Sequence, residues 1–186
     1  MKKILLIVAV SLFSFAASAQ VKFAHVNFAE LVQLMPEADS ARSTIEAQSK
    51  EAQETYAAMV EEYNAKAATY QQKMSTWTPA IRESKEKELE EIVARIREFD
   101  QSIQLELQQK QQSLMAPIQK KALDTVNALA KAGGYIYVFD VNSALYIDES
   151  QSVDLTTAAR KALNIPEGRT LESLQQELAA KANVQN

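Results

Sequence analysis

The chain has 186 residues, enough for one domain of ordinary size, with 47% hydrophobic and 24% charged residues. This composition excludes both a disordered polyelectrolyte and an integral membrane protein. The formal net charge is −4, and no cluster of Lys and Arg indicates nucleic-acid binding. Three glycines and no cysteine favour long helices and exclude a disulfide framework.

Residues 1–19 have the parts of a secretory signal peptide. Lys2 and Lys3 supply a positive start, residues 4–16 are an apolar run, and a small-x-small site ends at Ala19. We therefore expect cleavage between Ala19 and Gln20. The apolar run is too short to span a membrane as a mature helix, and no later stretch is apolar enough. We expect an exported protein without stable membrane insertion, located in the periplasm.

The mature chain should open with a strand and a short helix. Residues 21–28 are rich in β-branched and aromatic residues and predict a strand. It carries the only histidine, His25, for which a structural role is expected. Residues 28–35 have apolar side chains at helical spacing, and this helix should end before Pro36, because proline disfavours helical geometry in the residue ahead of it. Pro36 and Glu37 suit the start of the next helix.

The stretch from Glu37 to about Lys131 contains no glycine and predicts two long helices joined as a hairpin. In its first half, large aromatic residues recur at every seventh position, and a second position lies four residues before each, which is the spacing of a helix packed on another helix. These positions are Tyr56, Tyr63, Tyr70 and Trp77, with Ala52, Met59, Lys66 and Lys73 before them. Because each tyrosine hydroxyl needs a partner or water, this contact should be looser and wetter than a leucine zipper.

The aromatic row allows two interpretations. It either packs on the second helix and does nothing else, or it stays partly exposed and offers adaptable apolar contacts together with Met59 and Met74. At the tip, Thr78 should cap the second helix, with Pro79 as its first residue. Trp77 should be the most exposed large aromatic, serving either to close the hairpin end or to contact a partner.

The second helix should bend near its base. Its apolar positions repeat every eleven residues, as in Ile92, Ile103 and Leu114, which keeps a helix nearly straight. Pro117 interrupts this pattern, removes one backbone hydrogen bond and should kink the helix. We therefore expect a hinge at Pro117, where the hairpin joins the rest of the molecule.

The last third of the chain should form the rest of a small body. After two glycines, residues 135–141 predict a central strand, and residues 144–147 predict a shorter strand that pairs with it as a hairpin. A helix over 155–163, capped by Ser152 or Asp154, follows, and a last amphipathic helix begins at Thr170. A sheet of about three strands is too small to be stable alone, so we expect oligomerisation through the sheets. The expected interface residues are Val26, Phe28, Tyr135, Tyr137, Val138 and Phe139.

The expected fold is therefore α+β but mainly α, a long coiled-coil hairpin (tentacle) inserted in a small β-sheet body that oligomerises; that the body trimerises is what the family resemblance described below implies. We expect the signal peptide at 1–19 and the β-rich body at 20–36 and 119–165. The helical arm should occupy 37–118, and a helical tail 166–186.

This order of segments resembles the Skp/OmpH-like family of periplasmic chaperones. The resemblance covers roughly residues 21–163 and rests on the signal peptide, the long hairpin, the opening strand at 22–27, and the segments 134–140, 144–146 and 154–156. It implies a homotrimer whose three arms enclose a cavity, where unfolded outer-membrane proteins are held without ATP or another cofactor. The residues expected to contact these clients are Tyr56, Met59, Tyr63, Tyr70, Met74 and Trp77.

The chain departs from the family in one respect, and a second function stays open. Well-known members are basic, whereas the arm is mildly acidic, so no lipopolysaccharide site is expected. The alternative function is a periplasmic spacer or adaptor that docks through its tip at Trp77 and Pro79. Catalysis is not expected, because the chain has one histidine, no cysteine, no glycine-rich phosphate loop and no metal-ligand spacing.

Overall fold

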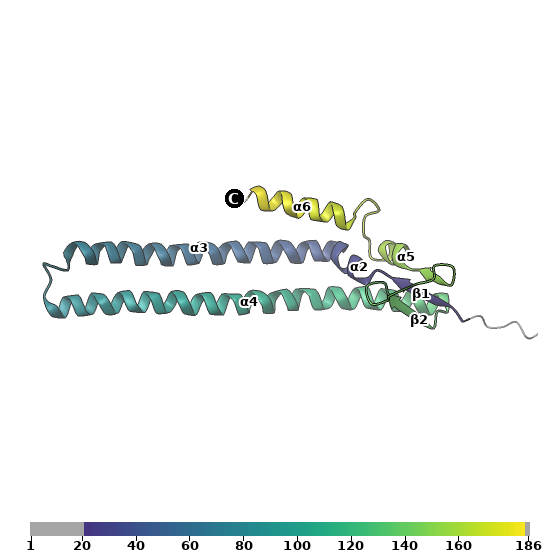
Figure 1. Ribbon diagram of the computed structural model, residues 1–186, viewed down its shortest axis with the longest axis horizontal. Helices are drawn as coiled ribbons and strands as arrows, with labels where there is room; N and C mark the ends of the chain where they lie inside the picture. Colours follow the sequence, from purple (N-terminus) through teal and green to yellow (C-terminus); the bar gives the residue numbers. More distant parts are fainter. Residues whose placement is uncertain (1–20, 185–186) are drawn as a thin grey trace, which may run out of the picture.

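The computed structural model describes residues 21–184, in which a long two-helix arm extends from a small body (Figure 1). The predicted signal peptide and its cleavage site lie outside the described residues. The mainly helical α+β fold with a long hairpin is confirmed. The elements in chain order are β1 (Phe23–Val26), α2 (Phe28–Leu34), α3 (Pro36–Lys73), α4 (Pro79–Gly133), β2 (Tyr137–Asp140), β3 (Ser152–Asp154), α5 (Thr156–Ala162) and α6 (Leu171–Val184).

The arm consists of α3 and of the part of α4 that runs beside it. α3 has 38 residues, which at about 1.5 Å per residue makes it roughly 57 Å long. It begins at Pro36, as predicted. At the tip, the Thr78 hydroxyl accepts a hydrogen bond from the backbone N–H of Ile81 at 3.4 Å, which confirms the predicted cap of α4.

α4 is one continuous helix of 55 residues that connects the tip to the body. Pro117 lies inside it and does not end it. Figure 1 shows α4 as one uninterrupted helix. Pro117 is exposed, whereas the next residue, Ile118, is buried in the core of the body. The helix ends as predicted at the glycine pair, where Gly134 has a positive φ of 68°.

The sheet corrects two expectations. Its strand order is β2-β1-β3 and both pairings are parallel, so β1 is central and β2 lies at an edge. Residues 144–147 form no strand, and β3 comes from 152–154 instead. A hairpin would have placed the two C-terminal segments antiparallel and side by side. The loop 141–151 returns the chain to the other edge of β1, where a parallel strand can pair.

The body core is built around α2. Three of its most deeply buried side chains are Leu31, Leu34 and the following Met35. β1, α3, α4, α5 and α6 each contribute further buried residues, and these are Val26, Ala38, Ala41, Ile118, Ala122, Val126, Ala159 and Leu174. α6 lies beside the first turns of α3, so the tail is placed at the arm base (Figure 1).

Candidate functional site

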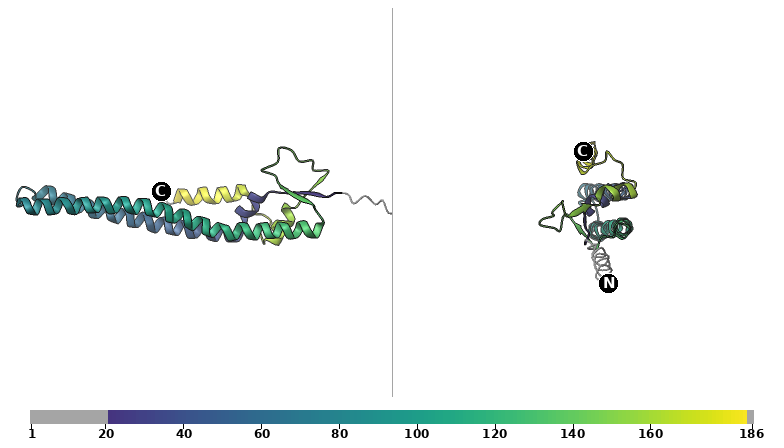
Figure 2. Two further views of the ribbon diagram at one scale, coloured as in Figure 1. Left: turned by 90° about the horizontal axis from the view of Figure 1, so that it is seen from below. Right: turned by 90° about the vertical axis from the view of Figure 1, so that its right-hand side faces the viewer.

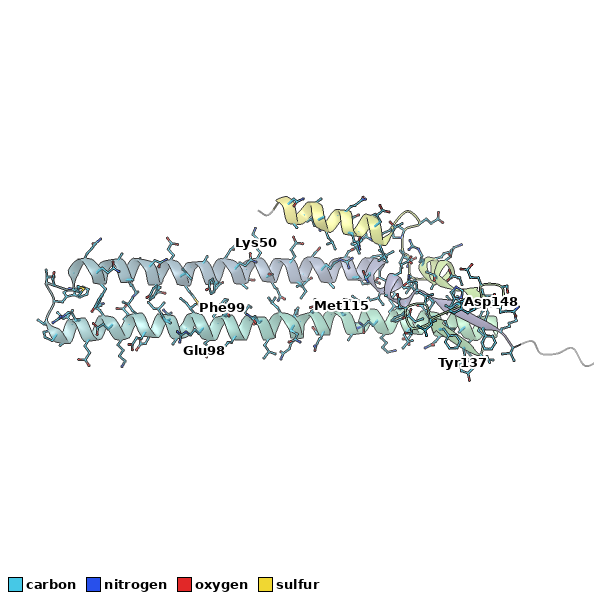
Figure 3. All side chains as sticks on the ribbon, in the orientation of Figure 1. Lys50, Glu98, Phe99, Met115, Tyr137 and Asp148 are labelled. Carbon is cyan, nitrogen blue, oxygen red and sulfur yellow. The ribbon has the colours of Figure 1, made fainter. Side chains whose placement is uncertain are left out.

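The contact between α3 and α4, here called the seam, contains little buried surface. Between residues 42 and 117, all of which the structure describes, Ile92 is the only buried side chain, at 2% exposure. Phe99 and Met115 lie on the side of α4 that faces α3, and both are only half-buried (Figure 3). Apolar side chains on both helices of the arm are therefore partly accessible along most of its length.

Polar side chains link the two helices in the distal half of the arm. Lys66 forms an ion pair with Glu88, and Arg95 forms one with Glu62 at 3.2 Å. Lys66 and then Lys85 donate to the Glu88 carboxylate, and these hydrogen bonds lower the pKa of Glu88 to about 2. The same contact with Glu88 raises the pKa of Lys66 above its usual value. Ion pairs and hydrogen bonds thus replace much of the apolar packing that a leucine zipper would have here.

The predicted aromatic row does not form one continuous surface. Tyr56 is exposed, and Tyr63 is half-buried. The Tyr70 hydroxyl donates to the Glu86 carboxylate, which raises the pKa of Tyr70. Tyr70 also contacts Trp77 edge-to-face, with ring centroids 5.9 Å apart. The row is therefore divided into an exposed proximal tyrosine and a packed cluster at the tip.

The tip cluster corrects the expectation for Trp77. This ring is half-buried against Tyr70, whereas Tyr146 in the body is 83% exposed. Trp77 lies in the tip loop between α3 and α4, and its ring packs on Tyr70 of α3, which is why it is not the most exposed aromatic. The two methionines of the expected contact set differ, since Met59 is half-buried and Met74 is exposed.

At the arm base, ion pairs tie α3 to its neighbours. Lys121 of α4 pairs with Glu37 and is the main cause of the lowered pKa of Glu37. Arg169, which precedes α6, pairs with Asp39 at 2.6 Å. These contacts surround the buried core, so the base of the arm is packed more tightly than its distal half.

One face of the sheet carries an uncovered aromatic row. Phe23 of β1 stacks on Tyr137 of β2 with centroids 6.4 Å apart, and Tyr137 contacts Phe139 at 5.9 Å. Tyr137 and Phe139 are 59% and 50% exposed, and Figure 3 shows Tyr137 pointing away from the body. His25 lies on the same face of β1 but is buried, and its Nδ1 is 2.8 Å from the hydroxyl of Ser152. This contact joins β1 to β3 and agrees with a structural role for the histidine.

The other expected interface residues lie elsewhere. Val26 is buried in the core of its own chain, and Phe28 and Val138 pack against that core. Tyr135 is half-buried next to Gly133. Of the six, only Tyr137 and Phe139 are exposed, because side chains alternate between the two faces of a strand and Val138 points inward.

The loop 141–151 carries two exposed apolar residues that were assigned to a strand from the sequence. It stands out from the rest of the body (Figure 2), and Leu145 and Tyr146 are both exposed. The polar residues on either side, at 142–143 and 148–150, were the available signal for a projecting loop.

Among residues 21–184, no group of three or more His, Cys, Asp or Glu side chains could hold a metal ion. None of the helices in this range combines the length and apolar character needed to cross a membrane.

Comparisons with known proteins identify the family. Residues 22–163 match the family model for outer membrane protein (OmpH-like). A search of curated proteins finds no significant match. A crystal structure from Caulobacter crescentus, assigned as an OmpH-like outer membrane chaperone, is similar with a TM-score of 0.70 and 12% identity, covering 80% of this chain and 86% of that chain. At this identity the structural comparison supports the fold, and the match to the family model assigns the sequence: the chain belongs to the OmpH-like family.

Proposed function

We propose that the protein is an ATP-independent holdase chaperone of the periplasm, which binds unfolded outer-membrane proteins between its helical arms and prevents their aggregation. Membership of the OmpH-like family supports a chaperone role in general. The observation that carries the proposal is the seam, in which Ile92 is the only buried side chain between residues 42 and 117. Half-accessible apolar side chains are thereby distributed over the whole length of the arm.

Such a surface suits clients that have no common sequence. An unfolded chain offers many apolar segments, each of which can make a weak contact with a different part of the arm. Several weak contacts made together hold a client firmly, while each one can still open and close without nucleotide hydrolysis. Flexible side chains such as Met59 and Met74 adapt to apolar groups of different shape.

We further propose that the arms are brought together in a homotrimer through the exposed sheet face of Phe23, Tyr137 and Phe139. An uncovered aromatic row beside an edge strand is a typical site of self-association. Tyr137→Lys should release monomers, because it places a charge in this interface. Leu105→Lys, on an exposed position of α4, is the matched control. Sedimentation of both variants tests this, and a Tyr137→Lys protein with the mass of the wild type would refute the interface.

An aggregation assay tests the holdase proposal. A urea-unfolded outer-membrane barrel protein is diluted into buffer with the mature chain and no nucleotide, while light scattering and the mass of the complex are measured. We expect suppressed scattering and one client per three chains. Full scattering in the presence of a well-folded oligomer would refute the proposal.

A triple variant of α3 tests whether the tyrosines of the arm contact the client. Tyr56, Tyr63 and Tyr70 replaced together by Ala should weaken client holding more than oligomer stability. The matched control replaces the exposed Ala57, Ala65 and Ala68 of the same helix by Ser. Loss of the oligomer without a separate effect on holding would contradict a role of the tyrosines in client contact.

No observation favours the spacer or adaptor. A spacer needs a rigid seam, whereas this seam is mostly half-buried. A docking tip needs an available Trp77, which instead packs on Tyr70. The mildly acidic arm likewise offers no reason to propose a lipopolysaccharide site.

A further inference from the structure

The base of the arm contains a groove between α3, α4 and α6. Its volume is about 700 Å³, within the usual range of ligand-binding pockets. Five apolar side chains line it, namely Ala41, Ile45, Leu114, Met115 and Leu178. Charged side chains, among them Arg42 and Lys50, form part of its lining as well. The groove is thus an apolar surface bordered by charge, on the part of the arm that adjoins the body.

α6 contributes one residue, Leu178, to the lining of this groove, and it is packed on the body over only half of its length. Leu174 is 4% exposed and belongs to the body core, and Leu171 packs against it. One turn later, Leu178 lines the groove and is still 42% exposed. Every side chain from Gln175 to Asn183 is exposed. The distal half of α6 therefore lies beside an apolar groove without being buried in it.

The root of α6 is held firmly. Arg160 donates to the backbone carbonyls of Pro166 and Arg169, at 3.1 and 2.5 Å, and pairs with Glu30 of α2. Arg169 in turn binds Asp39 of α3. The Thr170 hydroxyl accepts from the Ser173 N–H at 3.1 Å and caps the helix. Because Leu174 is buried in the body core and residues 175–183 are exposed, the part of α6 after Leu174 can detach from the arm while its first turn stays in place.

We propose that α6 is a strap over the groove at the arm base, and that it competes there with the apolar segments of a client. Leu171, Leu174 and Leu178 form the apolar face of an amphipathic helix, the kind of surface that apolar grooves bind. When the strap is closed, Leu178 fills part of the groove, and a client segment must displace it. This inference rests on the proposed holdase function and adds a regulator to it.

Competition between the strap and a client lowers the apparent affinity of the protein for that client. The apparent affinity of a client is its intrinsic affinity multiplied by the fraction of molecules whose groove is open. Because Leu178 is partly covered when the strap is closed, removing its apolar contact should raise client affinity roughly threefold to tenfold. α6 lies outside residues 22–163, which the family model matches, so the family match does not imply the strap.

Two lysine substitutions on α6 test the strap. Leu178→Lys places a charge against the groove, whereas Ala180→Lys places the same charge two residues later, on the opposite face of the helix. Neither changes the buried Leu174, so the body core is left intact. We measure the fluorescence of the apolar dye anilinonaphthalene sulfonate with each protein, and the affinity for an unfolded outer-membrane barrel protein. Leu178→Lys should increase both, and Ala180→Lys should match the wild type. Equal values for the two variants would overturn the proposal.

Hydrogen exchange of the wild-type protein adds a direct readout. Client binding should accelerate exchange of the amides at 175–183 and slow it in the first turns of α3. Unchanged exchange of α6 in the client complex would contradict displacement of the strap.

The holdase proposal and the strap proposal fail in different ways. If the wild type holds no client, the holdase proposal fails while the dye comparison still tests the strap; if it holds clients and the two lysine variants behave alike, only the strap is refuted.

Discussion

Replacing Ile92 by Ala should open the distal half of the arm without unfolding the body. Ile92 is 2% exposed and stands apart from the body core, so its burial stabilises the seam alone. Ile→Ala substitutions in protein cores cost about 2–5 kcal/mol. The neighbours of Ile92 in the seam are half-buried and can close over the space, so the lower end, ~2 kcal/mol, is expected here. That value corresponds to a roughly thirtyfold increase in the population of the open arm.

Hydrogen exchange measured by mass spectrometry separates the two regions. Peptides from residues 60–95 should lose protection by about this factor, while peptides from the body should not change. Leu105→Ala is the control, because it removes an exposed side chain from the same helix and should shift protection by about 0.5 kcal/mol or less. An equal loss of protection in arm and body would show that they unfold as one unit, and an effect no larger than the control would show that the seam does not depend on Ile92.

Three further predictions concern the arm and the body. The hydrogen bond from Lys66 lowers the pKa of Glu88 from 4.5 to about 2. The ionised Glu88 therefore stabilises the seam at pH values above 4.5, and this stabilisation is lost as the pH falls through about 2. Acidification should therefore loosen the distal arm, with exchange of residues 60–95 as the measurement, and Glu88→Gln should remove that dependence; an unaltered acid response would contradict it. Gly134→Ala should cost about 1 kcal/mol, because φ is 68° there, and an unchanged thermal midpoint would speak against this. Val138→Asp should disrupt the body and release monomers in sedimentation, since Val138 packs against the core; an intact oligomer would show that this packing is dispensable.

The helical hairpin and its ends could be predicted because their causes are local. A glycine-free stretch with regular apolar spacing forms a helix wherever its neighbours lie. Thr78 caps α4 through a hydrogen bond only three residues away, and Gly134 ends it because glycine tolerates a positive φ. The loose seam was likewise indicated by the tyrosine and lysine residues at its heptad positions.

The sequence by itself determined the long arm, its caps and which aromatic residues recur at heptad spacing, since each of these features depends on residues a few positions apart. Only the tertiary structure decided which segment pairs with β1, where Trp77 lies and how far α6 is buried. Residues 144–147 have more β character than residues 152–154, yet residues 152–154 form the strand because they reach the free edge of β1, more than a hundred residues away in the chain. Such pairings are set by packing around a shared core, and no local pattern records them.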